Sequence, residues 1–262
     1  MKILDGRELA GFIKERQARQ VATLQTKPTL LIIRDSNNPV ITKYVNLKVK
    51  YGEDIGVHVI DYHATSTDDI KAKIIAANTD PQINGIILQL PITDKDQTDS
   101  ITSLISPKKD VDGLSGNPKA HDSATATAIN WLLAGYDITL TNQKIAIVGR
   151  GKLVGAPLYR MLTKSNYIVD IFHRGSDLTK LNQYDIIISA TGIPGLIVDS
   201  MVRPGVVIID AGTASDKGVL KGDLSPEVHA RTDLKAITPE LGGVGPLTVA
   251  CLFDHLLQAS TS

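Results

Sequence analysis

The chain has 262 residues, of which 42% are hydrophobic and 21% charged, and its formal net charge at pH 7 is zero. This composition is ordinary for a globular protein of one large or two modest domains. A net charge of zero gives no basic surface of the kind that binds nucleic acids or anionic membranes. The sequence also lacks the run of roughly 20 apolar residues that a membrane helix requires. The single cysteine, Cys251, excludes an intrachain disulfide and favours a cytoplasmic location, and six histidines without metal-ligand spacing predict no metal site.

Strand and helix patterns alternate through the first half of the chain. An Asp5/Glu8 capping pair predicts an opening helix, and short apolar runs predict buried strands at 29–34, 57–62 and 85–89. A turn at 35–39 leads to an expected helix that carries Tyr44 and Lys48 and stops at Gly52 or Gly56. Further helices are expected over 68–77, with Thr67 as cap, and over 97–104. This alternation is typical of a doubly wound parallel sheet, so the predicted fold class is α/β.

A glycine-, proline- and charge-rich segment from residue 107 to Asp122 marks a domain boundary. A helix is expected over 123–133, and buried strands at 144–148, 167–172, 184–189, 206–210 and 235–237. The helices expected between and after them cover 156–162 and 246–257. The sequence therefore predicts a second α/β domain, with its own parallel sheet.

The segment 144–155 has the layout of a dinucleotide site, with a buried strand, a glycine turn and a helix. Gly149 suits the tight turn and Gly151 the close approach of a pyrophosphate, at a helix N-terminus that favours anions. The third glycine of a Rossmann fingerprint is expected at Val154 and stands instead at Gly155. The glycines alone fit a dinucleotide site and an ordinary turn equally well.

The strand expected at 167–172 ends at His173 and Arg174, without the acidic residue that binds the ribose hydroxyls of NAD. Arg150 and Arg174 could together flank a 2′-phosphate, which guanidinium groups bind well. This favours NADP over NAD. The alternative is that both arginines are solvated surface charges.

A second group of polar residues gathers around the first sheet. Tyr44 and Lys48 are four residues apart on one predicted helix and share a face. Gln89 and Pro91 follow a parallel strand at the end where ligands bind, and Asp112 stands at the domain boundary. Together these groups could hold a heterocycle and move a proton. Taken singly, each has an ordinary explanation as a solvated lysine or a turn residue.

Six blocks of sequence, in order, carry a resemblance to a known family. They are YVNLK (44–48), GIILQLP (85–91), KDVDG (109–113), VGRGKLVGAP (148–157), PGVVIIDAG (204–212) and TPELGGVGPLT (238–248). Along nearly its whole length the chain resembles the bifunctional methylenetetrahydrofolate dehydrogenase/methenyltetrahydrofolate cyclohydrolase family.

The resemblance implies roles by matching position. Lys48 corresponds to the catalytic lysine, Gln89 to its hydrogen-bond partner, Tyr44 to the residue that stacks beside the pterin, and Asp112 to the carboxylate that binds the pterin. Further substrate-binding residues are Leu90, Pro91, Gly242, Gly243 and Pro246. The NADP-binding residues are Gly149, Arg150, Gly151, Val154, Gly155, His173, Arg174, Thr191 and Gly192.

The resemblance also implies an organisation and a setting. A folate-binding catalytic domain with a parallel sheet is expected over 1–122 with 244–262, and a Rossmann-like NADP-binding domain over 123–243, so that the last helix returns to the first domain. A cytoplasmic homodimer that acts on a tetrahydrofolate derivative in one-carbon metabolism and purine biosynthesis is expected.

The chain departs from the family pattern at four places. Ser123–Ala126 replaces a Pro-Cys-Thr-Pro block, and the preceding segment, Gly116–Asp122, is shorter than in the family. Gly151 replaces a serine, and Leu241 replaces a proline. Changed entry to the folate site and changed cofactor affinity are expected. Two alternatives to the bifunctional enzyme stay open, namely a monofunctional dehydrogenase and a non-catalytic folate- or dinucleotide-binding regulator. The joint presence of Lys48, Gln89 and Asp112 argues against the regulator.

Overall fold

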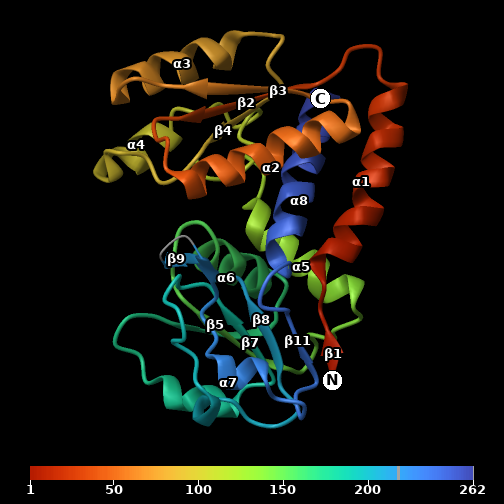
Figure 1. Cartoon of the computed structure of the whole chain (residues 1–262), viewed down its shortest axis with the longest axis vertical. Coiled ribbons are helices and arrows are strands. Elements are labelled where there is room, and N and C mark those ends of the chain that lie inside the picture. Colours follow the sequence, from red (N-terminus) through yellow and green to blue (C-terminus); the bar gives the residue numbers. More distant parts are fainter. Residues whose placement is uncertain (217–218, 262) are drawn as a thin grey trace. The chain divides into compact units, whose positions relative to one another are not determined.

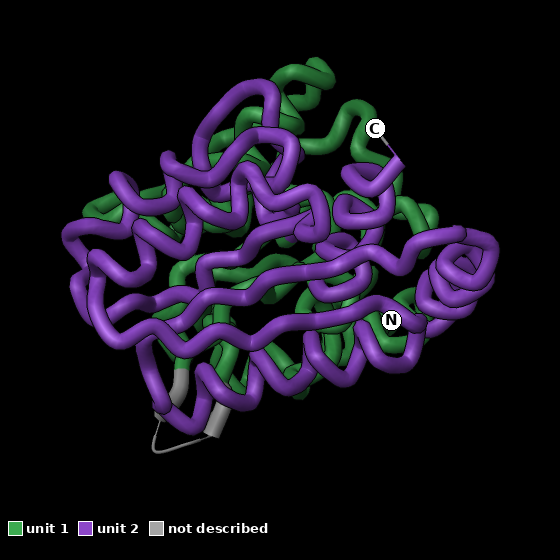
Figure 2. The backbone as a smooth tube through the Cα atoms, turned by 90° about the horizontal axis from the view of Figure 1, so that it is seen from above, with its two compact units in different colours: residues 1–10, 125–248 green, residues 11–124, 249–262 purple. Residues whose placement is uncertain are grey.

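The computed structural model describes residues 1–216 and 219–261, which form two compact units (Figure 2). Unit 1 comprises Met1–Ala10 and Thr125–Thr248, and unit 2 comprises Gly11–Ala124 and Val249–Ser262. Each unit is built around a parallel sheet of its own. The predicted α/β class with two domains is confirmed, and both units are discontinuous in sequence.

The sheet of unit 2 has the strand order β3 (His58–His63), β2 (Thr29–Arg34), β4 (Gly85–Leu88), with parallel pairing throughout. The central strand β2 is leucine- and isoleucine-rich, and five of its six residues are buried. A continuous apolar run of this kind is what a strand covered on both faces requires. Ile70 and Ile74 of α3 (Thr67–Thr79) pack against Leu31 and Ile33 in one hydrophobic cluster.

Helix α2 (Pro39–Ile55) is defined by a signal at each end. The Asn38 side chain accepts a hydrogen bond from the Val40 N–H, and Gly56 ends the helix in the left-handed conformation (φ 82°). The alternative stop, Gly52, lies inside the helix, where an added Cβ would come within 2.4 Å of a Val59 methyl. Gly52 therefore serves the close packing of α2 on β3.

The C-terminal part of α8 (Val244–Ser260) packs within unit 2, between α1 (Gly6–Thr23) and α2 (Figure 1). Phe253 stacks on Tyr51 with ring centroids 4.9 Å apart. The Tyr51 hydroxyl donates to Gln17 Oε1 (2.8 Å), and Gln17 Nε2 donates to the Ala250 carbonyl (2.9 Å). The last helix thus packs on the first half of the chain, as expected.

The sheet of unit 1 is larger and again parallel. Among the described strands its order is β1 (Lys2–Ile3), β11 (Ala236–Ile237), β8 (Val207–Asp210), β7 (Ile186–Ser189), β5 (Lys144–Val148), β6 (Ile168–Phe172). Strand β1 was not predicted, because its two residues are exposed and carry no apolar pattern. It joins the sheet through the backbone alone, with hydrogen bonds from Lys2 N to Lys235 O (3.0 Å) and from Leu4 N to Ile237 O (2.9 Å).

The remaining helices and strands complete the two units, and where one of them was expected from the sequence, its bounds differ only in detail. They are α4 (Thr98–Thr102), α5 (Ala124–Gly135), α6 (Gly155–Lys164), α7 (Pro226–His229), β9 (Ala214–Asp216), β10 (Val219–Lys221), and 3₁₀ turns at Lys95–Gln97, Leu178–Gln183 and Asp199–Met201. The cap of α3 is Ser66, whose hydroxyl accepts from Asp69 N (3.1 Å), so the choice of Thr67 was wrong. Within the described part of the chain, no helix is long and apolar enough to cross a membrane.

Candidate active site

Lys48 and Gln89 meet in unit 2, as predicted. Lys48 lies on α2 and is only 8% exposed, and its Nζ donates to Gln89 Oε1 at 2.8 Å. Gln89 directly follows β4, and its Nε2 donates to the Leu90 carbonyl at 3.0 Å. A carbonyl only accepts, so this second bond fixes the amide orientation and leaves Oε1 for the lysine. The glutamine therefore orients the amine without adding a charge.

Asp112 shares the electrostatic environment of Lys48. Burial lowers the pKa of Lys48, and the negative charge of Asp112 opposes this shift. Burial raises the pKa of Asp112 to about 6, and the positive charge of Lys48 opposes that shift. Desolvation thus dominates for both groups and favours their neutral forms. An amine whose pKa is lowered by burial gives up its proton more readily than a solvated lysine does.

The other predicted substrate residues of unit 2 flank this group. Tyr44 is partly buried one turn before Lys48 on α2. Leu90 and Pro91, which are joined by a cis peptide bond, follow Gln89. The Ala124 N–H donates to the Asp112 carbonyl (3.2 Å). The first turn of α5, where Ser123–Ala126 departs from the family pattern, therefore remains tied to the backbone of Asp112.

The predicted closing loop, Gly242–Pro246, lies in unit 1 beside the N-terminal segment. Gly6 N donates to Gly242 O (3.0 Å), and a Cβ added to Gly6 would lie 1.7 Å from the Gly243 carbonyl oxygen. Gly242 has a φ of +96°, in the region that favours glycine. The start of α1 thus holds the base of this loop, and the role of Gly242, Gly243 and Pro246 in folate binding stays a prediction.

The glycine turn after β5 has the geometry of a dinucleotide site. Gly149 has a φ of +111°, and a Cβ there would lie 2.5 Å from the Ala190 carbonyl oxygen. A Cβ on Gly155 would lie 1.9 Å from the Gly149 carbonyl oxygen. Gly155 therefore allows the close approach of α6 to the strand, which is the purpose of the third fingerprint glycine, although it stands one position later. Around Gly151 an added Cβ would meet no atom within 4 Å.

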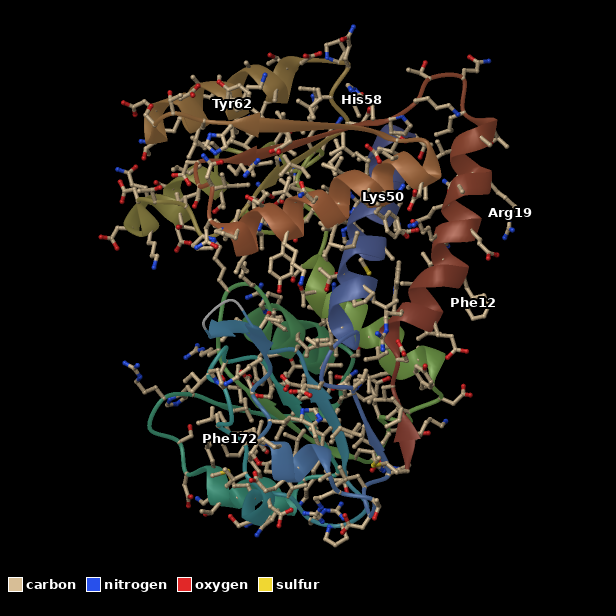
Figure 3. The ribbon with its side chains drawn as sticks, viewed as in Figure 1. Phe12, Arg19, Lys50, His58, Tyr62 and Phe172 are labelled. Atoms are coloured by element: carbon tan, nitrogen blue, oxygen red, sulfur yellow. The ribbon has the colours of Figure 1, made fainter. Side chains whose placement is uncertain are left out.

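Arg150 and Arg174 occupy equivalent positions on neighbouring strands. Val148 and Phe172 are partners in the parallel register of β5 and β6, and each arginine follows two residues later (Figure 3, where Phe172 is labelled). Both arginines are exposed, as is His173, and the turn from His173 to Ser176 contains no acidic residue. The binding of the 2′-phosphate of NADP by these two arginines stays a prediction.

Asp223 is a structural residue beside the predicted cofactor loop, and the sequence did not point to it. Its buried carboxylate accepts from Ser189 Oγ (2.6 Å), Thr191 N (2.7 Å) and Ile193 N (3.0 Å). These bonds fix the loop of Thr191 and Gly192, which are predicted cofactor residues. The partners lie 30 to 34 residues before Asp223, and the only local signal was a Gly-Asp pair. A carboxylate with three such donors is a structural anchor of the loop.

Comparison with known proteins agrees with this geometry. Residues 4–112 match the model of the tetrahydrofolate dehydrogenase/cyclohydrolase catalytic domain, and residues 123–262 match the model of the NAD(P)-binding domain of the same family. The chain belongs to this family. The bifunctional protein FolD of Chlamydia felis is 37% identical over 282 residues, covering 98% of both chains.

Two solved structures extend the family match to the fold. The bifunctional FolD methylenetetrahydrofolate dehydrogenase/cyclohydrolase of Campylobacter jejuni has a TM-score of 0.92 and 30% identity, covering 100% of this chain and 99% of that one. The Trypanosoma brucei FolD, which was complexed with NADP and an inhibitor, has a TM-score of 0.90 and 28% identity, covering 99% and 97%. The tetrahydrofolate dehydrogenase/cyclohydrolase fold therefore extends over the whole chain.

Proposed function

We propose that this chain oxidises methylenetetrahydrofolate to methenyltetrahydrofolate with NADP and then hydrolyses the product to formyltetrahydrofolate. The observation that carries the proposal is the buried Lys48–Gln89 contact beside Asp112, in a chain that also holds the glycine turn. Full-length similarity to bifunctional FolD proteins supports it. The test is whether the purified protein forms NADPH and removes the methenyl product.

In the oxidation, the chain contributes binding and orientation. The turn Gly149–Gly155 with the N-terminus of α6 would hold the pyrophosphate of NADP, and Arg150 and Arg174 its 2′-phosphate. The bound nicotinamide supplies the hydride acceptor. No protein base is required, because loss of hydride leaves a cation that the folate nitrogens delocalise. Asp112 and Tyr44 would fix the pterin so that the reacting carbon is correctly placed.

In the hydrolysis, Lys48 would transfer the proton. Water attacks the methenyl carbon, a carbon–oxygen bond forms, and the water proton passes to the neutral Lys48 Nζ. One carbon–nitrogen bond of the ring then breaks, and the leaving nitrogen takes the proton back from the same amine. The hydroxyl proton is lost to water as the formyl C=O forms, so that the reaction releases one proton overall. The hydrogen bond from Lys48 to Gln89 holds the amine in place for both transfers.

The burial of Lys48 favours the bifunctional enzyme over a monofunctional dehydrogenase. Burying a lysine costs free energy, and hydride transfer does not use its proton. Despite this cost, Lys48 is only 8% exposed, and its amine is hydrogen-bonded to Gln89 in the arrangement that hydrolysis requires.

We assign folate binding to residues 1–122 with 244–262 and NADP binding to residues 123–243. We also infer, from the family resemblance, a cytoplasmic enzyme that supplies one-carbon units to purine biosynthesis.

We expect a homodimer from the same resemblance. Among the described strands, β3 is paired only with β2 and offers its other edge (Figure 3, His58 and Tyr62 labelled on β3). A free strand edge is a template for pairing with a second copy. The chain has a mass of 28.2 kDa, and sedimentation equilibrium should give twice this value. A monomer at micromolar concentration would contradict the expected homodimer.

Replacing Arg174 with alanine should weaken the binding of NADP far more than the binding of NAD. Only NADP carries the 2′-phosphate, and loss of one charge-assisted contact costs about 1.5–3 kcal/mol, or roughly a 10- to 150-fold higher Kd. The KM for each cofactor in the dehydrogenase assay measures the difference. Arg160→Ala, which removes an exposed arginine from α6, is the matched control and should change neither. If Arg174→Ala weakened the binding of both cofactors equally, the assignment of Arg174 to the 2′-phosphate would be wrong.

A further inference from the structure

The backbone on both sides of Asp112 is held by specific hydrogen bonds. The preceding carbonyl, of Val111, accepts from His255 Nδ1 at 2.8 Å. The following N–H, of Gly113, donates to Asp110 Oδ1 at 3.0 Å. The carboxylate of Asp110 is completely buried and also accepts from two further backbone N–H groups, those of Leu114 (3.2 Å) and Ser115 (2.8 Å). The peptides that carry Asp112 therefore have little freedom to rotate.

His255 brings the C-terminal helix into this arrangement. It lies on α8, it is 6% exposed, and a carbonyl partner requires that its Nδ1 carry the hydrogen. Its ring stacks on that of His121, with centroids 4.4 Å apart and planes at 10°. Since the stacked ring limits rotation of the imidazole, the Nδ1–H remains directed at Val111.

Leu256, the next residue of α8, packs against the same segment. A Cβ added to Gly85 would lie 2.7 Å from a Leu256 methyl and 2.8 Å from a Val111 methyl, so both side chains pack against the start of β4. Val111 is thus fixed by packing through its side chain and by His255 through its carbonyl. The direction of the next residue, Asp112, depends on both contacts.

We propose that His255 is a positioning residue for the folate-binding carboxylate. The hydrogen bond from α8 to Val111 sets the orientation of the Asp112 carboxylate toward the pterin, and it thereby raises affinity for folate without taking part in the chemistry. This inference rests on the proposed role of Asp112. A misplaced carboxylate weakens both of its hydrogen bonds to a planar donor pair, because such bonds depend strongly on angle.

Two amide substitutions of His255 distinguish positioning from simple loss of packing. Asparagine places its Nδ2–H near the position of the histidine Nδ1, so His255→Asn keeps the donor to Val111. Glutamine places its donor one bond farther along the side chain, so His255→Gln keeps the polarity and misplaces the donor. Both variants lose the stacked ring, so the difference between them does not come from loss of stacking and reports mainly the position of the donor.

The readouts are KM and kcat of the dehydrogenase reaction with methylenetetrahydrofolate and NADP. We expect His255→Gln to raise the folate KM by about 3- to 10-fold, the usual effect of one neutral hydrogen bond, with kcat and the NADP KM within about twofold of wild type. His255→Asn should keep the folate KM within about twofold. If His255 had a purely structural role, the folate KM would instead change alike in the two variants, or kcat and the NADP KM would change together with the folate KM.

Asp112→Asn in the wild-type background separates the two ways in which this account can fail. If the wild type turns over folate and Asp112→Asn raises its KM, equal folate KM values for His255→Asn and His255→Gln overturn the positioning role alone. If the wild type shows no folate-dependent NADPH formation, the proposed function fails and the positioning role fails with it.

Discussion

Replacing Lys48 with methionine is expected to lower cyclohydrolase turnover by about 10²–10⁴-fold, the usual contribution of general acid–base catalysis, and to leave dehydrogenase turnover largely intact. Methionine keeps the length and apolar packing of the buried stem and removes the amine, which is the proposed proton carrier and the donor to Gln89. Water attack requires a proton acceptor and then a donor, and Gln89 can be neither. Hydride transfer requires no protein base, so folate held by Asp112 and Tyr44 should still be oxidised.

Lys50→Met is the matched control for this substitution. Lys50 lies on the same helix, two residues later, but its side chain is 69% exposed and pairs with Asp54 at 2.8 Å (Figure 3). Loss of an exposed ion pair costs little, so both activities should stay near those of the wild type. If Lys48→Met hydrolyses the methenyl compound as fast as Lys50→Met does, the proton-transfer role of Lys48 is wrong.

Asp112→Asn is expected to weaken folate binding in both reactions. The amino-pyrimidine edge of a pterin presents two N–H donors, which a carboxylate accepts together. In the asparagine variant one acceptor becomes a donor that faces another donor. The KM values for methylenetetrahydrofolate and for the methenyl substrate should each rise by roughly 10- to 150-fold, the equivalent of about 1.5–3 kcal/mol for a hydrogen bond to a charged group. Lys48→Met, by contrast, should affect one reaction only.

The pH dependence of the wild type provides a second check on Asp112. Burial raises the pKa of its carboxyl to about 6, so the ionised form, which we propose binds folate, predominates only above this pH. Folate kcat/KM, which reports groups of the free enzyme, should therefore fall as pH decreases through about 6. In Asp112→Asn that fall should be absent. Asp122→Asn, in an exposed position of the same segment, should keep the wild-type profile; loss of the profile in that control would assign the titration to another group.

The sequence predicted the strands well because their physical signal is local. Strand β2 is a run of leucine and isoleucine that only a covered parallel strand can use, and its observed bounds, Thr29–Arg34, are those expected. The placement of Lys48 and Gln89 at one site also followed from local rules, whereas their direct hydrogen bond was implied only by the family resemblance. A four-residue spacing sets the face of a helix, and a parallel strand presents its last residues at the ligand edge of the sheet.

The sequence did not reveal the residues that hold the site together. His255 acts on Val111 across 144 positions and Asp223 on Thr191 across 32, and neither contact leaves a pattern of spacing. Strand β1 was missed for a related reason, since its place in the sheet rests on backbone bonds to a strand more than 230 residues later. Such contacts depend on how distant segments are brought together, which periodicity does not encode.

The most direct test of the central claim follows NADPH and methenyltetrahydrofolate together by absorbance, with purified protein, methylenetetrahydrofolate and NADP. For the wild type we predict NADPH formation with the methenyl compound removed faster than buffer alone removes it. For Lys48→Met we predict NADPH formation with accumulation of the methenyl compound. Absence of NADPH formation by the wild type would contradict the dehydrogenase assignment, and accumulation of the methenyl compound by the wild type would contradict the cyclohydrolase assignment.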